Sequence, residues 1–150
     1  MINQIVKIVN KSDNPLPQYS KAGDSGMDVR AHLPDGPVQI YSGERALIPT
    51  GLSVAIPEGN EIQVRPRSGL AYKQGLTVLN TPGTVDSNYR GDIGIIIINL
   101  NNSGKPAVIN HGDRIAQLVL APVSGVVWSP CRTLDETERG DGGFGSTGVE

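Results

Sequence analysis

The chain has 150 residues, a formal net charge of −2 at neutral pH and an aromatic content of only 4%. This length suits a single domain with its own core, and the near balance of charge argues against a broad nucleic-acid-binding surface. No apolar run approaches the roughly 18 residues of a membrane span, and no signal peptide opens the chain. We therefore expect a cytoplasmic protein that binds neither nucleic acid nor membrane.

Cysteine and histidine, the residues that most often build disulfides and metal sites, are scarce. Cys131 is the only cysteine, which excludes an internal disulfide. The two histidines, His32 and His111, are far apart in the sequence and lack the spacing of metal ligands. The sequence therefore predicts no metal site built directly from protein side chains.

Hydrophobic residues recur mostly with a period of two, the spacing of β-strands. Residues 52–66 alternate on both sides of Glu58-Gly59-Asn60, which predicts a β-hairpin with one buried face. Further strands are expected in 2–9, 43–52, 94–100 and 113–123. Turn signals every 8–12 residues are typical of an all-β sandwich or barrel.

One short segment, 67–75, is the only one that resembles a helix. Ser68 can serve as its N-cap, and Gly75 can end it in the left-handed conformation. The start of a helix carries unpaired N–H groups that attract anions, and Arg67 stands beside them. The alternative is a capped surface helix with a solvated arginine.

Three polar features stand out against this apolar pattern. In 79–94 the turn formers around Thr84-Val85 predict a tight hairpin with Asp86 and Tyr89 close together near its tip. Asp28 is expected at the start of a strand. Gln117 lies in an apolar strand, where its amide must either satisfy a backbone group or face a ligand. For Asp86 and Tyr89 the alternative is a local turn with a ring packed at its rim.

The chain ends in a glycine-rich segment, 143–148, that has the spacing G-x-G-x-x-G. This spacing often marks a phosphate-binding turn, but such a turn needs a strand before it and a helix after it. Nothing follows this one that could form the helix. A frayed tail is therefore the alternative that the segment itself leaves open.

Taken in order, five segments resemble the motifs of the trimeric deoxyuridine triphosphatases (dUTPases). They are SGMDV (25–29), PRSGLA (66–71), GTVDSNYRG (83–91), GDRIAQL (112–118) and RGDGGFGSTG (139–148). The resemblance implies an all-β, jelly-roll-like fold with one short helix. It also implies a β domain over 1–138, a flexible arm over 139–150 that closes over an active site, and a homotrimer with shared active sites.

The implied activity is hydrolysis of dUTP to dUMP and diphosphate, which lowers dUTP and supplies dUMP for thymidylate synthesis. By the same resemblance, Asp86 is the general base that orients and deprotonates the attacking water. The ring of Tyr89 lies under the deoxyribose and leaves no room for a 2′-hydroxyl. The resemblance also implies a set of residues that read uracil, chiefly through backbone groups: Asn80, Thr84, Val85 and Gly94.

The remaining implied roles concern the triphosphate. The resemblance places Arg67, Ser68 and Gly69 at a phosphate grip, with Gln117 on the α-phosphate. Mg²⁺ is the implied cofactor, held mainly by phosphates and water, with Asp28 hydrogen-bonding to metal-bound water or to neighbouring groups. The arm supplies a further set of substrate contacts, with phosphate donors and an aromatic lid: Arg139, Phe144, Gly145, Ser146 and Thr147.

The chain departs from the usual dUTPase pattern at four places and leaves two alternatives. Met27 precedes the first aspartate, Asp24 adds a negative charge nearby, TPGTV (81–85) replaces a more apolar third motif, and Asp141 adds a negative charge in the arm. One alternative is a dCTP deaminase-like enzyme of the same fold, although 79–91 contains no glutamate that could act as its base. The other is a non-catalytic nucleotide-binding module, which would tolerate loss of Asp86.

Overall fold

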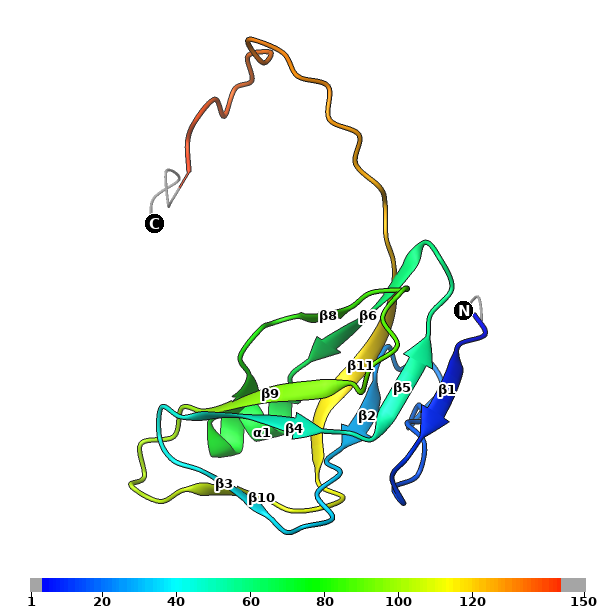
Figure 1. Cartoon of the computed structure of the whole chain (residues 1–150). Coiled ribbons are helices and arrows are strands. Elements are labelled where there is room, and N and C mark those ends of the chain that lie inside the picture. The colour runs from blue at the N-terminus through cyan, green and yellow to red at the C-terminus, as the bar shows by residue number, and fades with distance from the viewer. Residues whose placement is uncertain (1–3, 144–150) are drawn as a thin grey trace.

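The computed structural model describes residues 4–143, and this part of the chain is built almost entirely from short strands (Figure 1). The elements in chain order are β1 (Lys7–Asn10), β2 (Met27–Arg30), β3 (Val38–Ile40), β4 (Arg45–Pro49), β5 (Leu52–Ala55), β6 (Asn60–Arg65), α1 (Ser68–Gln74), β7 (Leu76–Val78), β8 (Gly83–Val85), β9 (Gly94–Asn99), β10 (Ala107–Ile109) and β11 (Arg114–Pro122). The all-β prediction with one short helix is confirmed.

The strands form antiparallel sheets that remain open. The largest has the order β2-β11-β6-β8, and a second has the order β4-β9-β7. Two further pairs, β1-β5 and β10-β3, complete the arrangement. Neighbouring strands are mostly distant in sequence, as expected of a jelly-roll-like fold in which the chain passes repeatedly between sheets.

The core consists of aliphatic side chains from both large sheets. On β9, Ile95 and Ile97 are fully buried and alternate with half-buried neighbours, and Ile48 of β4 packs with them. On β11 the buried face includes Ile115 and Leu118. Burying each such side chain contributes about 1.5–3 kcal/mol, so these few residues can anchor the domain without aromatic residues.

Both predicted hairpins are wrong. Strand β5 pairs with β1, whereas β6 pairs with β11 and β8, so the turn near Gly59 carries the chain between sheets. Likewise β8 pairs with β6 rather than with the strand that follows it. Alternation correctly identified the buried faces, but it carries no information about which strand lies alongside, because any strand with a matching apolar face can pair there.

Helix α1 ends as predicted but begins differently. Arg67, not Ser68, occupies the N-cap position, and no side chain caps the helix. Ser68 is the first helical residue. Gly75 ends the helix in the left-handed conformation, with φ 65°, and its N–H donates to the carbonyls of Ala71 and Leu70.

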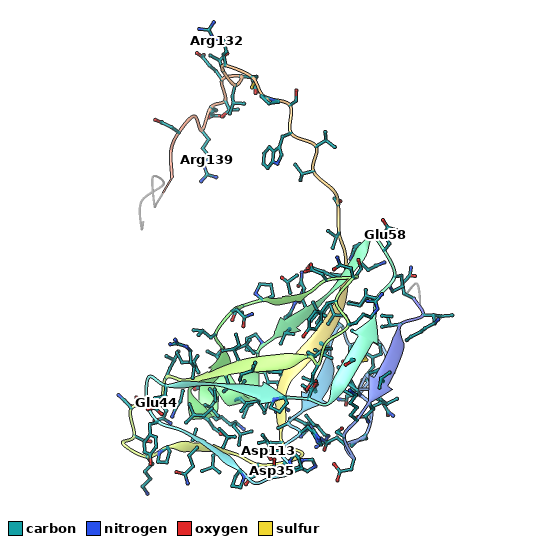
Figure 2. The ribbon with its side chains drawn as sticks, viewed as in Figure 1. Asp35, Glu44, Glu58, Asp113, Arg132 and Arg139 are labelled. Carbon is teal, nitrogen blue, oxygen red and sulfur yellow. The ribbon has the colours of Figure 1, made fainter. Side chains whose placement is uncertain are left out.

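After β11 the chain leaves the body of the domain. The N–H of Val123 donates to the carbonyl of Gly59 at 2.9 Å, and no later described residue hydrogen-bonds to the domain. Residues 124–143 contain no helix or strand and project away from the sheets, carrying Arg132 and Arg139 with them (Figures 1 and 2). Trp128 is 86% exposed on this segment. Over 4–143, no helix has the length and apolar character needed to cross a membrane.

Candidate functional site

An ion-paired cluster around Asp28 forms the first group of candidate residues. Both oxygens of its carboxylate accept hydrogen bonds: Arg67 Nε donates to Oδ1 at 2.9 Å, and Arg114 donates to Oδ2 at 3.3 Å. A second nitrogen of Arg67 donates to the backbone carbonyl of Arg114 at 3.0 Å. The cluster joins β2, β11 and the start of α1, so it depends on three segments that are distant in sequence.

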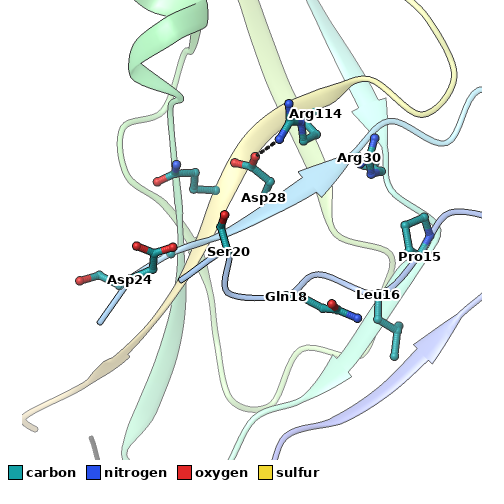
Figure 3. A pocket seen from close by; sticks show the side chains of 11 residues that line it. Pro15, Leu16, Gln18, Ser20, Asp24, Asp28, Arg30 and Arg114 are labelled. Carbon is teal, nitrogen blue, oxygen red and sulfur yellow. Dashed lines mark hydrogen bonds and ion pairs between the residues drawn. The ribbon is translucent and has the colours of Figure 1, made fainter. Parts of the chain in front are cut away.

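A cavity of about 450 Å³ opens beside this cluster (Figure 3). Its lining includes Asp24, Asp28, Arg30 and Arg114, and Arg30 donates to the carbonyl of Gly112 at 2.6 Å. With Arg67 adjacent, three arginines stand against two carboxylates. The excess positive charge makes this region attractive to an anion with several oxygens.

The cluster orients its arginines more than it stabilises the fold. The side chains of Asp28 and Arg67 are about a quarter exposed, and that of Arg114 is 54% exposed. Pairs this open to water typically contribute only about 0–1 kcal/mol. Their geometric effect is larger, because a carboxylate that accepts from two guanidinium groups fixes where both can point.

Gln117 lies at the same cavity, opposite Asp28 on the neighbouring strand. Its side-chain amide makes no hydrogen bond within residues 4–143. Gly26 leaves room for it, since a Cβ there would lie 3.0 Å from Gln117 Oε1. Within the described residues the amide therefore satisfies no backbone group, and it lines the cavity.

The second group of candidates lies in 80–94. Asp86 lines a separate cavity of about 770 Å³ together with Ser87, Asn60 and Glu61. The chain turns here because the N–H of Tyr89 donates to the carbonyl of Asp86 at 3.1 Å. Asp86 and Tyr89 thus lie at one turn, as predicted, although that turn is not the tip of a hairpin.

Strand β8 brings an unpaired backbone edge to this second group. It is the last strand of its sheet and pairs only with β6, which leaves one edge of Thr84 and Val85 free within the described residues. Asn80 lies next to this strand: a Cβ on Gly83 would be 3.2 Å from Asn80 Nδ2. Gly94 begins β9 beside Leu47, whose Cδ1 would lie 2.7 Å from a Cβ at that glycine.

The two groups do not meet within one chain. Gln117 stands opposite both Asp28 and Arg65, whereas Val85 stands opposite Ile62 on the far side of β6. Three strand spacings and the offset along β6 therefore separate Asp28 from Asp86 by roughly 20 Å. The cavities beside them share no lining residue.

The predicted arm residues are only partly described. Arg139 is exposed, and its Nε donates to the carbonyl of Gly142 at 3.0 Å, so its contacts are local. The other predicted arm contacts, Phe144, Gly145, Ser146 and Thr147, lie outside the described residues.

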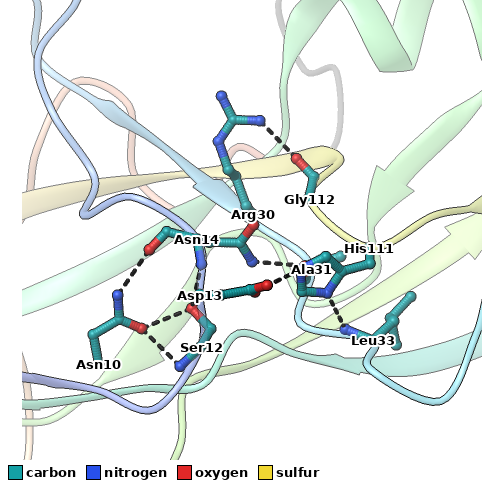
Figure 4. Close-up of polar contacts among 9 residues, drawn as sticks. All are labelled: Asn10, Ser12, Asp13, Asn14, Arg30, Ala31, Leu33, His111 and Gly112. Atoms are coloured by element: carbon teal, nitrogen blue, oxygen red, sulfur yellow. Dashed lines mark hydrogen bonds and ion pairs between the residues drawn. The ribbon is translucent and has the colours of Figure 1, made fainter.

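The two histidines are far apart in the sequence but meet in the fold. The rings of His32 and His111 pack edge to face, with centroids 5.7 Å apart, and Asp13 lies beside both. His111 Nδ1 accepts the N–H of Leu33 at 3.0 Å, so its proton is on Nε2, which donates to Asp13 at 2.7 Å (Figure 4). With no free lone pair on either nitrogen, His111 in this arrangement is a hydrogen-bonding group and not a metal ligand.

Arg30 and Arg114 were assigned no role from the sequence, although both stand in the Asp28 region. Arg30 lies on β2, the strand that carries Asp28, and Arg114 begins the neighbouring strand β11, where the register pairs it with Arg30. Alternation along β2 places Asp28 and Arg30 on one face, but the register shift between Arg114 and Ala116 appears only in the pairing of the two strands.

Comparison with known proteins identifies close relatives over almost the full length. The dUTPase family model matches residues 12–148. The chain is 54% identical to the deoxyuridine 5′-triphosphate nucleotidohydrolase of Roseobacter denitrificans, covering 89% of this chain and 87% of the relative. It is 57% identical to the enzyme of the same name from Bdellovibrio bacteriovorus, covering 95% of this chain and 94% of the relative.

Solved structures give the same match at the level of the fold. The dUTPase of Staphylococcus bacteriophage 80alpha with dUpNHpp is 26% identical, with a TM-score of 0.82, and the match covers 98% of this chain and 100% of the phage chain. A mutant dUTPase from phage phi11 of S. aureus, whose structure is described as revealing the coordination of a structural Mg(II) ion, is 25% identical. Its TM-score is 0.69, with 91% of this chain and 99% of the phage chain covered.

Proposed function

The chain belongs to the dUTPase family, and we propose that it hydrolyses dUTP to dUMP and diphosphate at a site built from more than one copy of the chain. The separation of the two residue groups within one chain is the observation that supports a shared site. The Asp28 group has the positive charge to hold a triphosphate. The Asp86 group has a carboxylate to activate the attacking water and an open strand edge to hold the nucleobase. By removing dUTP and producing dUMP, the enzyme supplies the precursor for thymidylate synthesis.

Triphosphate binding is assigned to the Asp28 cluster and its neighbours. Arg67 is held in place by Asp28 and by the carbonyl of Arg114, so it meets phosphate oxygens with little further loss of side-chain entropy. Ser68 and Gly69, exposed at the first turn of α1, add donors, and a Cβ on Gly69 would meet nothing within 4 Å. The unpaired amide of Gln117 contacts the α-phosphate.

Uracil recognition is assigned to the free edge of β8. The backbone N–H and C=O groups of Thr84 and Val85 match the donors and acceptors of a uracil edge, with Asn80 and Gly94 alongside. Cytosine presents an amino group where uracil has a carbonyl oxygen, which would leave buried polar groups of the site unpaired. Such mismatches produce large discrimination.

The chemical step is assigned to Asp86. Its carboxylate orients a water molecule for attack on the α-phosphorus and takes a proton from it. The bond between the α-phosphorus and the bridging oxygen breaks, and diphosphate leaves. Tyr89 packs against the deoxyribose and excludes a 2′-hydroxyl. Holding the water, the sugar and the phosphorus in line accounts for much of the acceleration, because an exposed aspartate is a weak base.

The donor set at the Asp28 cavity suits Mg²⁺. Its carboxylates, from Asp24 and Asp28, are hard oxygen donors, and both oxygens of Asp28 already accept from arginines. Mg²⁺ keeps several waters and binds readily through phosphates, so Asp28 would hold the ion through water. When bound, the ion neutralises charge on the triphosphate.

Assembly into a homotrimer is supported by an uncovered apolar sheet face. On the outer side of β4-β9-β7, Leu47 stands opposite Ile96 and is 68% exposed, and Ile98 lies on the same side. Covering this face with another copy removes apolar area from water and also brings a second copy of each residue group near the first. The roughly 20 Å gap within one chain is then bridged between chains.

The C-terminal arm is assigned the last part of the site. Residues 1–138 form the β domain, and 139–150 close over a bound nucleotide on a neighbouring copy. Arg139, Ser146 and Thr147 supply phosphate donors, Gly145 lets the backbone approach closely, and Phe144 stacks on the base. We also propose a cytoplasmic location, since Cys131 is exposed and free, as thiols are in reducing compartments.

The first prediction tests the function directly. Purified protein with Mg²⁺ is offered dUTP, dCTP, dTTP and UTP in separate reactions, and diphosphate release is measured. We expect release from dUTP and little from the other three. Conversion of dCTP to dUTP without diphosphate would instead identify a deaminase, and binding of dUTP without turnover would identify a non-catalytic module.

The second prediction concerns Asp86. Asp86→Asn keeps the size and polarity of the side chain but removes its basicity, so dUTP binding should persist while single-turnover hydrolysis falls at least roughly a hundredfold. Asp35→Asn, at an exposed turn outside both groups, serves as the matched control. Hydrolysis by Asp86→Asn at the rate of the control would exclude the general-base role.

The third prediction concerns the arm. A chain that ends at Glu138 should melt at the same temperature as the full chain, because the described part of the removed segment makes only local hydrogen bonds. If the arm acts mainly on the transition state, kcat should fall by more than KM rises. Normal melting together with full activity would mean that this segment is a frayed tail.

A further inference from the structure

The turn that carries Asp86 contains a glycine whose lack of a side chain determines where the neighbouring tyrosine lies. We propose that Gly91 is a positioning residue for Tyr89, and that it thereby contributes to the choice of deoxyribose over ribose. The inference rests on the proposed function, in which the ring of Tyr89 packs against the sugar.

The steric relation between the two residues is direct. A Cβ built on Gly91 would overlap the hydroxyl oxygen of Tyr89 and would lie 2.6 Å from Cζ and 3.0 Å from Cε2. Carbon–carbon contacts at the shorter of these distances are strongly repulsive, because non-bonded carbons are most stable at about 3.5–4.0 Å. Any side chain at position 91 therefore displaces the ring.

The ring cannot yield freely, because its far end is attached to the domain. The hydroxyl of Tyr89 donates to the backbone carbonyl of Asp92 at 2.9 Å. That stretch of backbone is held by Thr50, which is 1% exposed and whose hydroxyl lies 2.7 Å from the carbonyl oxygen of Ile93 and 3.2 Å from Asp92 Oδ1. Displacing the ring thus breaks the hydrogen bond that fixes it.

Backbone conformation does not explain the glycine. Nine described glycines have positive φ, and Gly91 is not one of them. An alanine at 91 therefore strains no backbone dihedral of the left-handed kind, and its effect is confined to the contact with Tyr89. The turn itself is secured separately, because Arg90 donates to the carbonyls of Ser87 and Tyr89, each at 2.7 Å.

Exclusion of a single hydroxyl depends on the position of the blocking ring. A close steric fit that rejects one small group is typically worth roughly 10- to 200-fold in kcat/KM, and a shift of the ring opens space where the 2′-hydroxyl would lie. We expect Gly91→Ala to lower the ratio of kcat/KM for dUTP over UTP by at least roughly tenfold, toward the ratio of Tyr89→Ala.

The experiment compares Gly91→Ala with Tyr89→Ala, Tyr89→Phe and the control Asp35→Asn. Asp35 is exposed in a turn and lines neither candidate cavity. For each variant the dUTP/UTP ratio of kcat/KM and the melting temperature are measured. The proposal expects a lower ratio for Gly91→Ala, a smaller decrease for Tyr89→Phe, which loses only the anchoring hydroxyl, and no change for Asp35→Asn.

The outcomes separate this inference from the function on which it rests. If Tyr89→Ala lowers the ratio but a folded Gly91→Ala does not, the positioning role is overturned while the dUTPase activity stands. If Gly91→Ala fails to fold, Tyr89→Phe decides, and an unchanged ratio in that variant overturns the proposal. If the unaltered protein does not hydrolyse dUTP, the proposed function fails first, and the inference fails with it.

Discussion

The antiparallel ladder β2-β11-β6-β8 sets the geometry on which everything else depends. Its strand spacing and register fix Asp28 and Gln117 on β2 and β11, and they place Val85 and Asp86 roughly 20 Å away at the β8 edge. A shift of one residue along such a strand would turn its buried face outward, so packing keeps the strands in register. A chain with this ladder holds both candidate groups rigidly, and under the proposed function another copy brings them together.

Within each group, glycines leave room for the candidate side chains. Gly26 makes room for Gln117, Gly83 for Asn80, and Gly91 for Tyr89. In each case a Cβ would come within 3.2 Å of the neighbouring side chain or closer. The polar groups are then oriented by a second partner, such as Asp28 for the arginines and the Asp92 carbonyl for the Tyr89 hydroxyl. Packing and hydrogen bonding together restrain these candidate side chains.

The sequence predicted the chemistry of this protein better than its pairings. Order and spacing of five motifs identified the family, and alternation identified the buried faces of β5 and β6. The sequence could not predict that β5 and β6 belong to different sheets, or that Asp13, His32 and His111 lie close together. Those features depend on contacts between distant segments, which local periodicity does not encode. Arg114 was missed for the same reason.

The shared site is the central claim, and subunit mixing tests it most directly. Chains carrying Asp86→Asn and chains carrying Arg67→Ala are each nearly inactive alone under this account. When the two are unfolded together and refolded as mixed trimers, roughly a quarter of the sites should combine an intact Arg67 from one copy with an intact Asp86 from another, and dUTP hydrolysis should return to that level. Activity no greater than that of the two variants refolded separately would mean that each site lies within a single chain.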